Sequence, residues 1–129
     1  MGQLRPTPQS EQLKDRTKRF AIQLVRFYRT LPKTGEAPVI GKQVLRSGTS
    51  VAANYRAACR ARSKTEFIAK IGVVVEEIDE TVFWLELLVE SGVVDPRQMD
   101  GLLPEAKELL AIFAASQRTA RSANGSMKK

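Results

Sequence analysis

The sequence predicts an all-α protein, an antiparallel up-down-up-down bundle of four helices. Four segments repeat apolar residues at steps of three and four, the period of a helix with one buried face. Short breaks separate them, the first and third of which contain Pro and Gly, and no segment shows the alternation typical of a strand. Short connections favour antiparallel neighbours, and 129 residues suffice for one domain with its own core. We expect a mobile tail over residues 1–9, the bundle over 10–121 and a second mobile tail over 122–129.

The first two helices are predicted from their end signals and apolar faces. The first begins at Ser10 as N-cap and ends before Pro32 and Gly35, with an expected core face of Leu13, Thr17, Phe20, Leu24, Phe27 and Leu31. The second begins near Pro38, with an expected core face of Ile40, Val44, Ser47, Val51, Tyr55 and Ala58. Residues 47–50 either weaken this helix or permit close approach of another, and both readings allow a bend.

The third helix has the strongest signal. Ser63 and Glu66 fit a capping box, and Gly92 suits the C-terminal end. Its heptad line is Phe67, Ile71, Val74, Ile78, Thr81, Leu85 and Leu88. A second apolar line runs beside it through Ile68, Val75, Val82 and Val89. Two adjacent lines predict that more than one neighbour covers this helix.

The fourth helix is expected to start near Asp95 and Pro96, an N-cap followed by a favoured first residue. Pro104 is either a second start or a slight kink. The expected core face is Leu102, Ala106, Leu109, Phe113 and Gln117, with Leu110 alongside.

Groups that carry out catalysis are scarce in this chain. It has no histidine, which excludes Ser–His–Asp and Cys–His schemes, and it has no glycine-rich phosphate loop. The single cysteine, Cys59, excludes an internal disulfide and is expected to be a small buried hydrophobe. Beyond Glu66, the third helix carries six carboxylates, which we interpret as a solvated or interface-facing strip rather than a metal site: Glu76, Glu77, Asp79, Glu80, Glu86 and Glu90. We therefore expect no enzyme activity, cofactor, metal or small-molecule substrate.

Targeting signals are also missing from the sequence. The start shows no apolar signal region, and Pro6 stands where a myristoylation signal needs Ser or Thr. No apolar run reaches the roughly 18 residues of a membrane span. We expect a cytoplasmic protein with no membrane role.

Charge is unevenly distributed along the chain. Residues 1–70 carry 15 Lys/Arg against 4 Asp/Glu (+11), residues 71–112 carry 2 against 10 (−8), and residues 113–129 add four basic residues. The basic half can neutralise nucleic-acid phosphates, and it can equally be a solvated face or a partner for the acidic helix. The nucleic-acid candidates are Arg19, Arg26, Arg46, Arg56, Arg60, Arg62 and Lys64.

Phe83 and Trp84 lie outside the main heptad line of the third helix. They either fill the bundle or anchor a contact between subunits, and we favour the contact. The expected oligomer interface is Glu76, Glu77, Glu80, Phe83 and Trp84.

Residues 46–88 carry a family resemblance. Arg46-Ser47-Gly48-Thr49-Ser50-Val51-Ala52-Ala53-Asn54, then Ala61-Arg62-Ser63, Phe67, Glu76-Glu77 and Trp84-Leu85-Glu86-Leu87-Leu88 resemble the bacterial four-helix-bundle proteins, also called the 23S rRNA intervening-sequence protein family. The similarity covers about residues 12–118, and its motif positions are Ser47, Ser50 and Asn54. Many members follow that Asn with an acidic residue and glycine, where this chain has Arg56-Ala57.

The resemblance implies an antiparallel four-helix bundle that assembles as a ring-like homopentamer without enzymatic activity. Some members are encoded within insertions of ribosomal RNA genes, and the accessory protein of diversity-generating retroelements, a basic nucleic-acid-binding pentamer, is a structural relative. Two functions therefore compete. The chain is either a nucleic-acid-associated accessory protein, with RNA or DNA and copies of itself as partners, or a protein–protein scaffold.

Overall fold

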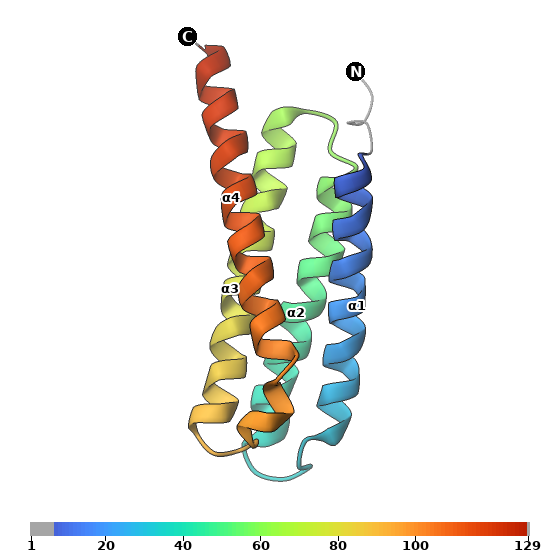
Figure 1. Ribbon diagram of the computed structural model, residues 1–129, viewed down its shortest axis with the longest axis vertical. Coiled ribbons are helices and arrows are strands. Elements are labelled where there is room, and N and C mark those ends of the chain that lie inside the picture. The colour runs from blue at the N-terminus through green and yellow to red at the C-terminus, as the bar shows by residue number, and fades with distance from the viewer. Residues whose placement is uncertain (1–6, 129) are drawn as a thin grey trace.

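The computed structural model describes the backbone of residues 7–128 and the side chains of residues 7–122. Its long helices are α1 (Pro8–Thr30), α2 (Ala37–Ala58), α3 (Lys64–Glu90) and α4 (Leu102–Lys128), with a short 3₁₀ turn, η1 (Pro96–Met99), before α4. No strand occurs in the described part of the chain. The helices alternate in direction, so the start of α1, the α2–α3 connection and the end of α4 share one end of the bundle (Figure 1). We call it the upper end. The predicted antiparallel four-helix bundle is confirmed.

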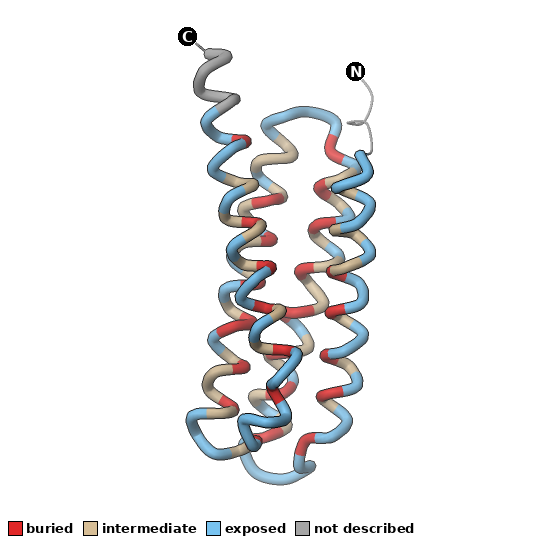
Figure 2. Tube along the Cα trace, in the orientation of Figure 1, coloured by how far each residue is buried: buried red, intermediate tan, exposed pale blue. Residues whose placement is uncertain are grey.

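Most predicted core positions of the four helices are buried (Figure 2), whereas Leu13, Ile40, Phe67 and Gln117 are only partly buried. Phe20, Leu24, Ile78, Leu85 and Phe113 are at most 1% exposed, and the other heptad positions of α3 from Ile71 to Leu88 are equally buried. The second line of α3 is only partly covered, since Val82 alone among its four members is buried. In the single chain, therefore, the second line of α3 remains partly accessible.

Small residues bring α1 and α2 into close contact. A Cβ atom added to Gly48 would overlap Cδ1 of Leu24 on α1, so a larger residue at this position requires the Leu24 side chain to shift. Because α2 runs unbroken from Ala37 to Ala58, the close-approach reading of residues 47–50 is confirmed.

Two helix starts differ from the predicted ones. Thr7, not Ser10, caps α1: the Ser10 amide donates to Thr7 Oγ1 (3.0 Å) and the Thr7 amide donates to Ser10 Oγ (2.9 Å). Pro8 at the first helical position favours this earlier start. Asp95 caps η1, and Pro104 lies in the first turn of a separate helix α4, as the second-start reading proposed.

The end of α4 also lies later than predicted. The helix continues to Lys128, whereas a tail was expected from residue 122. Residues 1–6 lie outside the described residues, and the mobility expected for both tails stays a prediction.

Candidate nucleic-acid interface

A basic groove lies between α1 and α2 at the upper end of the bundle. Its volume is about 580 Å³, and small side chains of α2 (Thr49, Ala52 and Ala53) contribute to its lining. Its charged lining residues are Glu11, Lys14, Asp15, Lys18, Arg56 and Arg60. Lys14 and Lys18 are one helical turn apart on α1, as are Arg56 and Arg60 on α2, so each pair lies on one side of its helix. We call this the α1–α2 groove.

The α1–α2 groove keeps an excess of positive charge. Lys14 Nζ lies 2.7 Å from a carboxylate oxygen of Glu11, and Asp15 pairs with Arg19 (3.0 Å). Lys18, Arg56 and Arg60 form no ion pair with any described residue. Three cations therefore remain available to an external anion.

The predicted nucleic-acid candidates fall into two groups. Arg56 and Arg60 line the α1–α2 groove, and Arg62 and Lys64 follow in the exposed α2–α3 connection and at the start of α3. Arg26 is exposed lower on α1. None of these five has an ion-pair partner within the described part of the chain.

The other two candidates are already paired. Arg19 contacts Asp15, and Arg46 contacts Glu80 and, at 3.4 Å, Glu77 of α3. Arg46 therefore links α2 to α3 within one chain and is less available to an external anion.

Lys14 and Lys18 line the groove but were not among the selected candidates. Their spacing of four matches that of Arg56 and Arg60, and this shared period is the signal that could have found them. Which of the six basic residues of α1 face α2 depends on how the two helices pack, which composition does not show.

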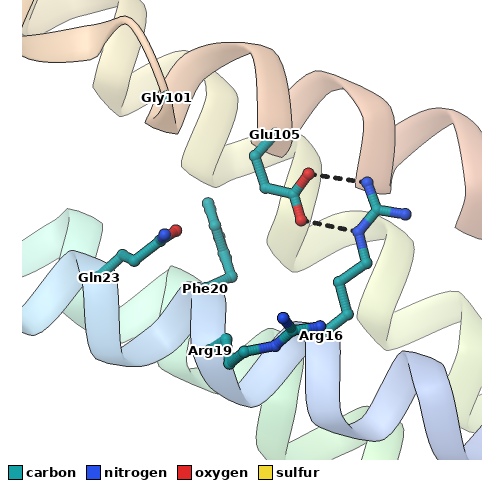
Figure 3. A pocket seen from close by; sticks show the side chains of 6 residues that line it. All are labelled: Arg16, Arg19, Phe20, Gln23, Gly101 and Glu105. Carbon is teal, nitrogen blue, oxygen red and sulfur yellow. Dashed lines mark hydrogen bonds and ion pairs between the residues drawn. The ribbon is translucent and has the colours of Figure 1, made fainter.

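Arg16, although part of the same basic run, points to the other side of α1. Its Nε and one terminal nitrogen lie 2.8 and 2.7 Å from the two oxygens of Glu105 on α4 (Figure 3). That nitrogen also lies 3.1 Å from Glu108. The hydrogen bonds to Glu105 raise the pKa of Arg16 above its already high ordinary value. The three residues bridge α1 and α4 beside a cavity of about 300 Å³.

The expected oligomer interface is partly engaged within the chain. Glu77 and Glu80 pair with Arg46, and the Trp84 indole N–H donates to Glu80 (2.8 Å). Phe83 is 53% exposed, and its ring meets that of Trp84 edge-on at 5.0 Å. Neither residue alone decides between a place in the bundle and a contact between subunits, because Phe83 lies on the surface whereas Trp84 packs partly against the core.

The Ser47, Ser50 and Asn54 positions have structural roles. Ser47 is fully buried with its Oγ 2.8 Å from Oγ1 of Thr81 on α3. The Asn54 side-chain amide donates to the carbonyl oxygen (2.9 Å) and the hydroxyl (2.8 Å) of Ser50 one turn earlier. The motif therefore serves packing and local hydrogen bonding of α2.

The remaining candidate groups are dispersed. Cys59 is half-buried, and burial raises the pKa of its thiol. No three acidic or thiol side chains come together as a metal site among the described residues. No helix in that part of the chain combines the length and apolar character needed to cross a bilayer.

The sequence and fold were compared with known proteins. A family model described as 23S rRNA-intervening sequence protein matches residues 10–115. A crystal structure of a protein of unknown function from the S23 ribosomal protein family of Bacteroides thetaiotaomicron is also similar. It has a TM-score of 0.77 and 32% sequence identity, over 84% of this chain and 97% of that chain. No significant match to a curated protein was found.

Proposed function

The chain belongs to the 23S rRNA-intervening sequence protein family, and on this premise we propose that it is a non-enzymatic accessory protein that associates with nucleic acid. The observation that carries the proposal is the α1–α2 groove, where Lys18, Arg56 and Arg60 are without an ion-pair partner among the described residues. The family description supports ribosomal RNA as the first polyanion to test.

The groove suits backbone contact rather than base readout. Its cations sit on two helix walls above small side chains, and no aromatic residue lines it as a stacking surface. Phosphate contacts release counterions, which makes affinity depend steeply on salt and little on sequence. Arg62 and Lys64 extend the basic surface toward the α2–α3 connection.

We propose that copies of the chain associate, as a ring of five by the family resemblance. Association would place several weak basic surfaces on one particle and raise affinity through avidity. Phe83 supports this idea, because a phenylalanine exposed beside Trp84 gains from burial against a neighbour.

The test measures binding of a labelled RNA by fluorescence anisotropy at several salt concentrations. The variant Arg56→Gln/Arg60→Gln removes two groove cations, and the control Arg97→Gln/Lys107→Gln removes two positive charges from η1 and α4. We expect the groove variant to weaken binding and to lower the slope of log affinity against log salt by about 1–2, with the control near wild type. Equal loss in both variants would point to non-specific attraction by net charge. Undetectable RNA and DNA binding at low salt would contradict the proposal.

A protein–protein scaffold is the second candidate, favoured by the exposed Phe83. In that case the wild-type chain self-associates but binds no RNA or DNA, and neither the Arg56→Gln/Arg60→Gln variant nor the Arg97→Gln/Lys107→Gln variant changes the anisotropy.

A further inference from the structure

The bundle is open between its first and last helices. α2 packs closely on α1 and α3, and α3 on α4, but α1 and α4 approach each other far less than these pairs. Small residues on the facing part of α4, among them Ala115 and Ser116, cannot fill the space between them. The result is a groove of about 660 Å³ at the upper end of the bundle, which we call the α1–α4 groove.

Apolar side chains line the α1–α4 groove. Leu13 of α1, Phe67 of α3 and Ile112 of α4 are only partly buried there, so the single chain leaves much of their surface uncovered. Because these side chains keep apolar surface in contact with water, an occupant that covers them gains free energy. The lining also includes serine, threonine and glutamine side chains, and its one acidic residue, Glu11, is paired with Lys14.

The dimensions of the groove match a short helix. Its walls are the N-cap and first turns of α1 (residues 7–14) and residues 112–120 of α4, each roughly 12 Å long at the rise of an α-helix. Anchors at positions i, i+3, i+4 and i+7 of an amphipathic helix span roughly 10 Å, which fits this length. An open groove covers one face of such a helix and leaves its polar face in water.

The charged residues that line the groove indicate which kind of amphipathic helix it can bind. Of the charged residues that line the groove, Lys14 and Glu11 are paired with each other, so Lys64 gives the lining its net positive charge. Lys64 has no ion-pair partner among the described residues. We propose that the α1–α4 groove docks an amphipathic helix of a partner protein, whose apolar face fills the groove and whose flanking residues are acidic.

This site adjoins the proposed nucleic-acid interface, whose extended basic surface includes Lys64, but it does not depend on nucleic-acid binding. Glu11 and Lys14 belong to the linings of both grooves, so the first turns of α1 divide a basic groove from an apolar one. The two grooves therefore adjoin at the upper end and share part of their lining.

The test uses a short synthetic peptide helix with leucines at i, i+3, i+4 and i+7 and flanking glutamates, and a twin with lysines in place of the glutamates. Ala115→Trp fills the groove, and Ala111→Trp places the same exposed side chain on α4 outside the lining. We expect Ala115→Trp to weaken the glutamate peptide at least about tenfold and Ala111→Trp to leave it unchanged. The lysine peptide should bind wild type about tenfold more weakly, and Lys64→Gln should reduce that difference.

Three results would overturn the proposal. The first is equal affinity of the glutamate peptide for wild type and the Ala115→Trp variant, and the second is equal affinity of wild type for the two peptides. The third is that wild type forms an oligomer which the Ala115→Trp substitution by itself dissociates. The last result would assign the groove to a second copy of the chain. Thermal unfolding is the check that both tryptophan variants are folded. RNA binding, measured in parallel, should be the same in both, which separates this test from that of the α1–α2 groove.

Discussion

Oγ1 of Thr81 on α3 lies 2.8 Å from Oγ of Ser47 on α2, at a point where neither side chain is exposed. Each hydroxyl also lies within hydrogen-bond distance of the carbonyl oxygen four residues earlier in its own helix, that of Glu77 or Gln43. The pair is therefore a polar link between the two most extensively packed helices, with no unsatisfied buried group.

This link should contribute modestly to stability. Because each hydroxyl keeps a backbone acceptor when the other is removed, we expect Ser47→Ala or Thr81→Val to lower the free energy of unfolding by about 0.5–1.5 kcal/mol. The double variant should cost less than the sum of the single ones, because they remove the same interaction. Urea unfolding of the four proteins in the cycle measures this coupling, and strict additivity would show that the link contributes nothing.

Gly48 should resist substitution despite its place in a helix. Ala is favoured over Gly in a helix interior by about 1 kcal/mol, but a Cβ here overlaps Leu24. We expect Gly48→Ala to destabilise by about 1–3 kcal/mol through overpacking. Gly72→Ala is the matched control, because its Cβ meets only the end of the flexible Gln117 side chain at 3.3 Å. A Gly48→Ala variant as stable as the Gly72→Ala variant would contradict the close packing.

Arg16 should hold α1 and α4 together. Arg16→Gln removes a two-pronged contact that is about a quarter exposed (28% and 24% for the two side chains), so a loss of about 1 kcal/mol or less is expected. Hydrogen exchange should nevertheless rise in α1 and α4 more than in α2 and α3, since the α1–α4 contact is sparse. Arg19→Gln, which removes only an exposed contact within α1, should leave exchange in α4 unchanged.

Alkaline pH should destabilise the fold through Tyr55 and Cys59. Burial raises the pKa of Tyr55 above its ordinary 10.0 and that of Cys59 above its ordinary 9.0. As the pH rises, both groups ionise in the unfolded chain before they ionise in the folded one. Their contribution to the free energy of unfolding is therefore complete below about pH 9 and is lost as the pH rises further. Urea midpoints measured across this range should fall less in Tyr55→Phe than in wild type. Parallel curves for the two proteins would contradict this.

Phe83 should control self-association. Phe83→Ser removes the most exposed aromatic contact of α3, and we expect assembled protein to shift toward monomer in native mass spectrometry. Ile22→Ser is the control, since Ile22 is a large apolar residue that is 42% exposed on α1. If both variants keep the wild-type assembly state, Phe83 is not at the interface.

Some features follow from the sequence alone. The four helices, their core faces and the glycine-ended turns at Gly35 and Gly92 could be predicted, because apolar periodicity and positive-φ glycine are local properties. The start of α1 was missed by three residues, since Thr7-Pro8 and Ser10 both carry capping signals and only the folded chain chooses between them.

The site depended on packing. The sequence by itself determined that the first two helices are basic and the third acidic. Only the tertiary structure decided that Arg46 and Arg16 are used within the chain while Arg56 and Arg60 face a groove with Lys14 and Lys18. The physical reason is that the charge of a side chain is a property of the residue itself. Whether that charge is free to bind an external anion depends on which side chains of the neighbouring helices lie close to it. Those neighbours are set by how the apolar faces of helices distant in sequence pack together.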